Sequence, residues 1–357
     1  MSQKKIFSRR KALKSLGIAG AGTIAGCMGF GGGGGGNGGD QFRVGMVFTT
    51  AGLGDEGFND AAMDGLQRAK KELGISFNYA EPESSDQYST FLRQYAKGDY
   101  DLVCGLSFEM ATAMNQVAKD FPNQPFTIVD VAVKGDNIAS YLFKEHEGCY
   151  LVGIMNGMLT QRQLSAHGGS TNEEKIVGFV GGKKNPVIEK FHAGYKAGIK
   201  SFEEDIEFLS AYAGTWTRPS KGRSIAESMY NEGADIVFPA AGGTGLGVFQ
   251  AAQAKNRYAV GVDKPQSKAT PKYADVILGS MVKHVGEAFY RSIQNTMNNN
   301  HRGGDQVVLG LEREGVALVY GTKLGDNIPQ EVKSQVSSVR KKIINGKIDV
   351  PSTIQQY

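Results

Sequence analysis

The side chains best suited to hold a small molecule gather in one glycine-rich segment, Thr49–Asp60. It carries a carboxylate (Asp55), an aromatic ring (Phe58) and a carboxamide (Asn59) within five residues. These groups can exchange hydrogen bonds and stack on a flat ring, but they include no nucleophile–base pair for catalysis. An apolar run precedes the segment and an amphipathic one follows it, which predicts a strand, a loop and a helix. The loop then lies at the carboxyl edge of a strand, where open α/β sheets bind ligands.

Two aspartates, Asp130 and Asp263, end apolar runs that are typical of buried strands. An Asp after a strand is also common as a helix cap or turn former. Their matched positions in an internal repeat favour ligand contact. An ionised carboxylate accepts two O–H donors, so Asp263 suits vicinal hydroxyls and Asp130 suits a ring N–H.

Trp216 and Lys283 also follow predicted strands, and Trp216 is the only tryptophan of the chain. Facing Phe58 across a cleft, Trp216 would sandwich a planar base. Lys283 would donate to a hydroxyl. A core or loop anchor remains the alternative for Trp216, and a plain surface lysine the alternative for Lys283.

The glycine run 242–247 follows a predicted strand and opens a helix, an arrangement that invites a nucleotide-binding interpretation. The spacing fails because Val248 stands where a dinucleotide loop needs glycine, and no Gly-Lys-Ser/Thr follows. Gly242 is therefore expected to bring backbone N–H groups at a helix start close to a ligand.

Buried-strand and helical patterns alternate along the chain, which predicts an α/β fold of parallel sheets flanked by helices. The predicted helices include 89–97, 111–120, 186–202, 221–231 and 248–256. The predicted strands are Val44–Phe48, Leu102–Leu106, Phe126–Val131, Ile176–Val180, Ile236–Ala240, Tyr258–Val262 and Val276–Met281.

Three stretches of the first half recur in the second half at nearly constant separation, so we expect two similar lobes around a hinged cleft. Arg43–Val47 is echoed by Ile176–Val180, Tyr95–Val103 by Tyr230–Val237, and Phe126–Asp130 by Ala259–Asp263.

The N-terminal 40 residues have the composition of an export and anchoring segment. Residues 1–26 are predicted to be a signal peptide of the twin-arginine type, with SRRKALK at 8–14. Residues 24–27 resemble a lipoprotein cleavage box, so Cys27 is expected to carry a lipid anchor. The glycine-rich residues 27–40 are expected to be a flexible tether.

Composition excludes several classes of protein. Lys+Arg 40 against Asp+Glu 36, with no basic run interleaved with aromatic residues, gives no sign of nucleic-acid binding. None of the five histidines has metal-ligand spacing, and no pattern calls for a metal or a cofactor. Cys104 and Cys149 lie in apolar surroundings and are expected to be buried free thiols rather than a disulfide.

A set of short motifs resembles the BMP (basic membrane protein) family of ABC-transporter substrate-binding lipoproteins, whose studied members bind purine nucleosides. The similarity covers about 41 to 351. The motifs are DEGFN at 55–59, IVD at 128–130, EGCYLVG at 147–153, VGFVGG at 177–182, GADIVFPAAGGTG at 233–245, GVD at 261–263 and SMVK at 280–283.

The resemblance implies a periplasmic-binding-protein type I (ribose-binding-protein-like) fold. Crossovers are implied near Phe143–Glu147, Val262–Lys264 and Gly304–Val307, which gives a first lobe of 41–145 plus 264–304 and a second of 146–263 plus 305–357. Phe58 and Trp216 would stack the base and Asp130 would read a ring nitrogen. The remaining implied site residues, at or near the ribose hydroxyls, are Asp55, Asn59, Gly242, Asp263 and Lys283.

The resemblance further implies a monomeric, non-enzymatic receptor outside the cytoplasm, anchored by lipid, that delivers a nucleoside to an ABC permease and ATPase. Trp216 stands where the family has Phe, and relatives accept riboflavin, so riboflavin is an alternative ligand. A sensory receptor of the same fold is a second alternative. A nucleoside hydrolase or dehydrogenase is a third, although the metal-binding Asp cluster or dinucleotide loop that it needs is missing from the sequence.

Overall fold

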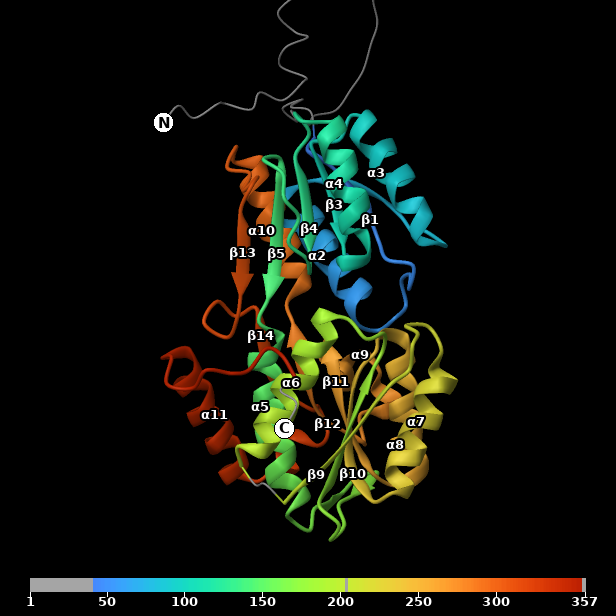
Figure 1. Ribbon diagram of the computed structural model, residues 1–357, viewed down its shortest axis with the longest axis vertical. Helices are drawn as coiled ribbons and strands as arrows, with labels where there is room; N and C mark the ends of the chain where they lie inside the picture. The colour runs from blue at the N-terminus through green and yellow to red at the C-terminus, as the bar shows by residue number, and fades with distance from the viewer. Residues whose placement is uncertain (1–40, 203–204, 355–357) are drawn as a thin grey trace, which may run out of the picture.

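A computed structural model of the chain describes residues 41–202 and 205–354. The predicted signal peptide (1–26), the cleavage box with Cys27 and the tether (27–40) lie outside the described residues. Two six-stranded sheets, one in each lobe, are arranged end to end along the long axis of the molecule (Figure 1). The predicted α/β fold of parallel sheets flanked by helices is confirmed.

The sheet of the first lobe has the strand order β13-β5-β4-β3-β1-β2, and all its pairs are parallel. These strands are β1 (Arg43–Val47), β2 (Ser76–Ala80), β3 (Leu102–Leu106), β4 (Phe126–Val129), β5 (Ile138–Phe143) and β13 (Gln306–Leu309). The helices that cover this sheet are α2 (Phe58–Leu73), α3 (Tyr88–Lys97), α4 (Ala111–Asp120) and α10 (Val285–Met297).

The sheet of the second lobe has the order β14-β12-β11-β10-β8-β9, with only β14 antiparallel to its neighbour among these pairs. The strands are β8 (Ile176–Gly181), β9 (Glu207–Tyr212), β10 (Ala234–Ala240), β11 (Tyr258–Asp263), β12 (Ile277–Lys283) and β14 (Val316–Tyr320). A small hairpin, β6 (Ser165–Ala166) with β7 (Gly169–Ser170), lies beside it. The helices are α5 (Glu145–Thr160), α6 (Pro186–Lys200), α7 (Pro219–Asn231), α8 (Leu246–Lys255), α9 (Gln266–Ala269) and α11 (Gln330–Ile344).

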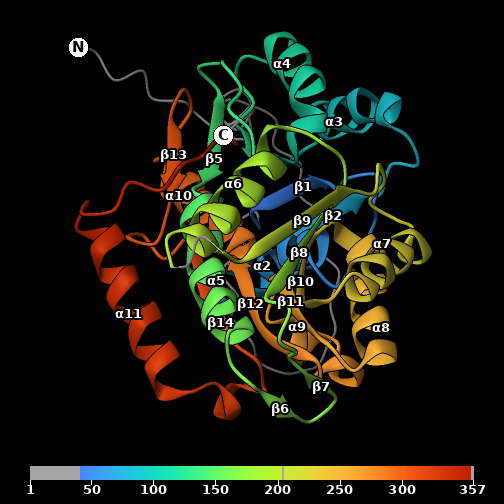
Figure 2. The same cartoon turned by 60° about the horizontal axis from the view of Figure 1, so that its bottom comes forward.

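Alternating side chains of the second sheet build two separate cores. Helices α5 and α6 lie on one side of this sheet, and α7 and α8 lie on the other (Figure 2). In β10, Ile236 and Phe238 pack on the side of α5 and α6, whereas Val237 packs on the side of α7 and α8. Because helices cover both faces of the sheet, the sequence of β10 is a nearly continuous apolar run. Helix α5 is buried almost all round, which fits its position between the sheet, α6 and α11. Gly194 lets α6 approach α5 closely, since a Cβ there would lie 2.2 Å from the carbonyl oxygen of His146.

The internal repeat is a repeat of structure. Five strands of each sheet follow the same spatial order, β5-β4-β3-β1-β2 in the first and β12-β11-β10-β8-β9 in the second. Strands β3 and β4 thus match β10 and β11. The loops after these strands face one another at the junction between the lobes (Figure 1).

The division into lobes differs from the expected one at two of the three crossovers. Strand β12 pairs with β11 in the second sheet, so the chain returns to the first lobe at Lys283–Val285, after β12 rather than near 262–264. Strand β13 pairs with β5 in the first sheet, so the last crossover is Leu309–Val316 rather than 304–307. The repeat, followed for one more strand, would have placed β12 correctly. Edge strand β13 is short, and its residues are largely exposed although three of the four are apolar.

The three crossovers are joined by hydrogen bonds. Lys144 N donates to the carbonyl oxygen of Leu309 (3.0 Å), and His284 N donates to that of Gly315 (2.9 Å). The carboxylate of Glu147 accepts from Leu311 N at 2.8 Å. These bonds make the three connecting segments one structural unit between the lobes.

Candidate functional site

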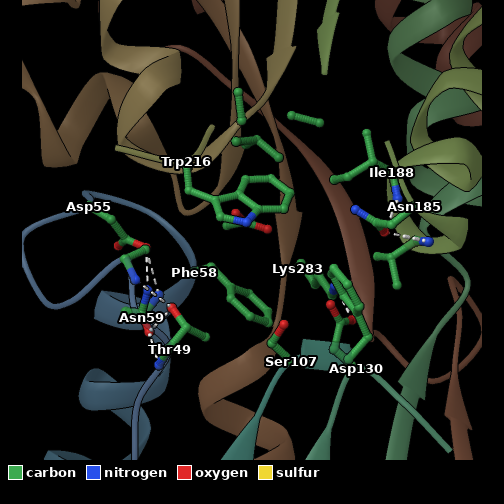
Figure 3. A pocket seen from close by; sticks show the side chains of 18 of the residues that line it. Thr49, Asp55, Phe58, Asn59, Ser107, Asp130, Asn185, Ile188, Trp216 and Lys283 are labelled. Carbon is green, nitrogen blue, oxygen red and sulfur yellow. Dashed lines mark hydrogen bonds and ion pairs between the residues drawn. The ribbon is translucent and has the colours of Figure 1, made fainter. Parts of the chain in front are cut away.

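A cavity with about 600 Å³ of empty volume, part of it open to solvent, lies between the facing edges of the two sheets. Both lobes line it, and all eight residues predicted to bind ligand are among the lining residues (Figure 3). They are Asp55, Phe58, Asn59, Asp130, Trp216, Gly242, Asp263 and Lys283.

Four of the strand ends at the cavity have a left-handed backbone. The φ angles are +82° at Ser107 after β3, +81° at Asp130 after β4, +55° at Gly242 after β10 and +63° at Asp263 at the end of β11. Such a conformation costs a non-glycine residue about 1–3 kcal/mol and is found where a binding or catalytic site requires it. The positive φ angle recurs at matched positions of both lobes, so the internal repeat extends to the backbone conformation of these strand ends.

The Asp55 carboxylate is occupied by its own loop. Its Oδ1 accepts from the backbone N–H groups of Gly57 (2.9 Å) and Asp60 (3.3 Å). Its Oδ2 accepts from the backbone and side-chain nitrogens of Asn59, both at 2.9 Å. A carboxylate offers about four acceptor positions. Asp55 therefore organises the start of α2, and its contact with a ribose hydroxyl stays a prediction.

Asn59 has one hydrogen atom left for a ligand. Its Oδ1 accepts from both the backbone N and the Oγ1 of Thr49 at 3.1 Å, and its Nδ2 donates once to Asp55. The first lobe's loop is thus largely satisfied internally. Its Phe58 ring and the Asn59 side chain line the cavity (Figure 3).

Lys283 is buried at the end of β12 between two carboxylates. Its Nζ donates to Asp130 Oδ1 and lies 2.9 Å from Glu145 Oε1, while Lys190 Nζ lies 3.3 Å from Glu145 Oε2. Burial alone would lower the pKa of Lys283, but Asp130, Glu145 and Asp263 outweigh it and raise that pKa above its usual value. Burial likewise opposes ionisation of Glu145, yet Lys283 and Lys190 lower its pKa.

This network leaves defined hydrogen-bonding capacity for a ligand. An ammonium group has three hydrogens, so Lys283 keeps at least one for a ligand, and Asp130 keeps its second oxygen. Burial raises the pKa of Asp130 to about 6, against the attraction of Lys283. Donor and acceptor stand side by side at one end of the cavity (Figure 3).

Asp263 is a carboxylate of the cavity with both oxygens unused by the described residues. Its side chain makes no hydrogen bond to any residue in 41–202 or 205–354, although it is buried. Burial raises its pKa to about 7; Lys283 opposes this, and the carboxylates of Asp55 and Asp130 add to it. A Cβ placed on Gly57 would lie 3.5 Å from Asp263 Oδ2, so the first lobe's loop comes close to this group across the cleft.

Phe58 and Trp216 enter the cavity from different lobes (Figure 3). Gly182, after β8, makes room for the indole, because a Cβ there would lie 2.2 Å from Trp216 Cζ3. The glycine run after β10 holds the Trp216 loop, since Thr244 N donates to the Trp216 carbonyl oxygen at 2.9 Å. Gly242 itself lines the cavity, where a Cβ would lie 3.4 Å from that same carbonyl oxygen.

Sequence reasoning missed four lining residues that matter for the geometry: Ser107, Glu109, Asn185 and Phe191. Ser107–Glu109 follow β3 and match the glycine loop after β10, so the repeat would have located them. Asn185 caps α6, its Oδ1 accepting from Val187 N at 2.9 Å and Ile188 N at 3.1 Å. Asn followed by Pro at a helix start was a readable signal.

The described part of the chain contains no group of three or more His, Cys, Asp or Glu side chains placed to hold a metal ion. None of its helices combines the length and apolar character needed to cross a bilayer. Cys104 and Cys149 are buried free thiols, as expected.

Two α/β lobes with a lined cleft between them are the architecture of the periplasmic-binding-protein type. A solved ABC-transporter solute-binding protein from Aeropyrum pernix shares this fold, with TM-score 0.77 and 27% identity over 87% of this chain and 94% of that one. A sequence profile described as "ABC transporter substrate-binding protein PnrA-like" matches residues 42–354. The chain therefore belongs to the Bmp family of ABC-transporter substrate-binding proteins.

Two relatives align over nearly their whole length. One, from Lactococcus lactis subsp. cremoris, is named an ABC transporter nucleoside-binding protein; it is 32% identical over 96% of this chain and 98% of its own. The other, from Pyrococcus furiosus, is named an uncharacterized lipoprotein; it is 32% identical over 92% of this chain and 84% of its own.

Proposed function

We propose that the cleft binds a neutral purine nucleoside and that the protein delivers it to an ABC importer without catalysing a reaction. The observation that carries the proposal is the pairing of two aromatic rings, one from each lobe, with a buried carboxylate, Asp263, whose acceptors are unused. A base stacked on an aromatic ring gains about 1–3 kcal/mol. The nucleoside-binding name of the Lactococcus relative points the same way.

Each part of the nucleoside has a proposed partner. Phe58 and Trp216 hold the faces of the base. Asp263 accepts from the ribose hydroxyls, and the adjacent Lys283 and Asp130 supply one donor and one acceptor to polar atoms at the end of the cavity. Asn59 adds one N–H, while Asp55 and Gly242 shape the loops around the ligand.

The charges of the cavity favour a nucleoside over a nucleotide. Besides Lys283, the charged lining residues are the carboxylates Asp55, Glu109, Asp130 and Asp263. A phosphate placed among them costs about 1 kcal/mol or more for each close like-charge contact.

The cellular setting belongs to the same proposal. Cys27 is the proposed lipid attachment site, outside the cytoplasm, in line with the lipoprotein name of the Pyrococcus relative. The partners are an ABC permease and its ATPase, and the receptor acts as a monomer.

Mass spectrometry of small molecules released by denaturing freshly purified protein tests the proposed ligand. A purine nucleoside at near-stoichiometric amount supports the proposal. Riboflavin in its place would assign the wider Trp216 ring to a flavin and reject the nucleoside. Conversion of added inosine by the pure protein would instead show an enzyme.

A further inference from the structure

Glu109 of the first lobe lies in a short 3-10 turn, Phe108–Met110, directly after β3. The turn is fixed by Ser107, whose Oγ accepts from Glu109 N at 3.3 Å. The Glu109 side chain lines the cavity, and 16% of it is exposed. Its position at the rim brings it within reach of the second lobe.

Both partners of the Glu109 carboxylate come from the second lobe. Lys183, after β8, places its Nζ 2.8 Å from Glu109 Oε1. Trp216, after β9, donates its indole Nε1–H to the same oxygen at 3.4 Å. Since the hinge connects the lobes elsewhere, opening the cleft separates this oxygen from both donors at once.

The contact bears directly on the ring that lines the cleft. Within the second lobe the indole rests against Gly182, and its backbone carbonyl is held by Thr244 N. The bond to Glu109 adds a cross-lobe contact at the indole's polar atom. The described residues make other cross-lobe contacts, such as Gln266 Nε2 to Glu56 O (2.8 Å) and Lys264 to Asp64 (2.7 Å), but neither engages a ring of the cavity.

We propose that Glu109 is a positioning residue that latches the closed cleft and sets the orientation in which Trp216 meets the ligand. The part of this inference that concerns ligand affinity rests on the proposed nucleoside-binding function. The latch itself depends only on the geometry of Glu109, Lys183 and Trp216. Its effect is expected chiefly on dissociation, because a latch formed after encounter slows the escape of the ligand.

The test compares wild type with Glu109→Ala, Glu109→Gln and Lys183→Met. Gln keeps an oxygen for the indole N–H, whereas Ala removes it. The matched control is Glu72→Gln, which removes a carboxylate from an exposed pair with Arg68 in the same lobe. Thermal unfolding of each variant verifies that it is folded.

The first readout is acrylamide quenching of the single tryptophan without added ligand. We expect roughly a twofold larger quenching constant in Glu109→Ala, an intermediate value in Glu109→Gln and no change in the control. The second readout is stopped-flow tryptophan fluorescence with guanosine. The dissociation rate should rise about two- to fivefold in Glu109→Ala, as expected for a partly exposed pair, with the association rate nearly unchanged.

A raised dissociation rate supports the latch whether or not quenching changes. An unchanged dissociation rate in Glu109→Ala overturns it. If neither guanosine, adenosine nor inosine binds to the wild type, the proposed function fails instead. In that case acrylamide quenching is the only test of the latch, and an unchanged quenching constant in Glu109→Ala would overturn it.

Discussion

Asp130 and Asp263 occupy matched positions in the two lobes and yet have different surroundings. Both end a strand, both have a left-handed backbone and both are 8% exposed. Asp130 is paired with the ammonium of Lys283, whereas the side chain of Asp263 has no hydrogen-bond partner in 41–202 or 205–354. The repeat thus supplies one carboxylate that is tied into the internal framework of the site and one whose side chain is not hydrogen-bonded to the described residues.

The same contrast extends to the walls of the cleft. In the first lobe, nearly all the hydrogen-bonding groups of the Asp55 and Asn59 side chains are bonded to each other or to their own loop. In the second lobe, Asp263 keeps its acceptors, and Trp216 reaches across to Glu109. The first wall is preorganised, and the second holds the capacity to recognise a polar ligand.

The largest expected effect is on stability, from replacing Lys283. Lys283→Met leaves Asp130 and Glu145 buried near each other without their shared cation, and breaking a buried pair in this way costs about 3–5 kcal/mol. Urea unfolding should show a correspondingly lower free energy of unfolding. Lys264→Met is the matched control, because its partner Asp64 is 65% exposed and such pairs contribute about 0–1 kcal/mol. Equal losses in both variants would contradict the framework role of Lys283.

Asp263 carries the next largest effect, on affinity. If it accepts from two ribose hydroxyls, Asp263→Ala removes charge-assisted bonds worth about 1.5–3 kcal/mol each, so affinity for guanosine should fall at least tenfold. Calorimetry measures this loss, and 2′-deoxyguanosine should lose affinity in wild type but little more in the variant. A loss below about tenfold would place the ribose elsewhere in the cavity.

Replacing Trp216 should have a moderate effect. Trp216→Ala should weaken guanosine binding by about 1–3 kcal/mol, whereas Trp216→Phe should keep most of the affinity because it retains an aromatic face. Phe58→Ala should resemble Trp216→Ala, and the double variant should depart from additivity. Guanosine should also change the fluorescence of the single tryptophan in wild type. Normal affinity in Trp216→Ala together with a silent spectrum would disprove the sandwich.

A further expected effect is a dependence of stability on pH. The folded-state pKa of Asp263 is about 7, above the ~3.9 of an unfolded aspartate, so the folded protein binds this proton more tightly between those values. The free energy of unfolding therefore falls as pH rises through that window. Asp130, whose pKa is raised to about 6, contributes with the same sign.

Asp263→Asn removes the share of this slope that belongs to Asp263. The variant should gain stability relative to wild type at pH 8, and the difference should shrink toward pH 4. Thermal unfolding across this range checks the prediction. A difference that is constant with pH would show that Asp263 titrates normally in the folded protein.

The sequence located the site better than it described the contacts within it. The end of a strand can be predicted where an apolar run stops at a polar residue. Because the ends of parallel strands lie at one edge of a sheet, Asp130, Asp263 and Trp216 were expected at one cleft. The pairing of Lys283 with Asp130 and Glu145 depends on distances between strands far apart in the chain, which no local pattern encodes. The sequence likewise does not show that backbone N–H groups occupy the carboxylate oxygens of Asp55, because those bonds depend on the three-dimensional path of the loop.

The lobe boundaries show the same limit. Crossover positions depend on which sheet a strand joins, and strand pairing is decided by tertiary contacts. Strand β13 illustrates this, because its short apolar run, QVVL, does not tell which of the two sheets it joins. Glu109 lies in the loop after β3, which matches the Gly242 loop after β10. The internal repeat was therefore the sequence signal that could have located Glu109.

The central claim is that the cleft accepts a neutral nucleoside, and calorimetric titration with guanosine and with guanosine 5′-monophosphate tests it most directly. With four carboxylates and one ammonium lining the cavity, the account predicts measurable binding of guanosine and clearly weaker binding of the monophosphate. Adenosine and inosine, each with its monophosphate, should follow the same order. Equal or tighter binding of a monophosphate would contradict the account.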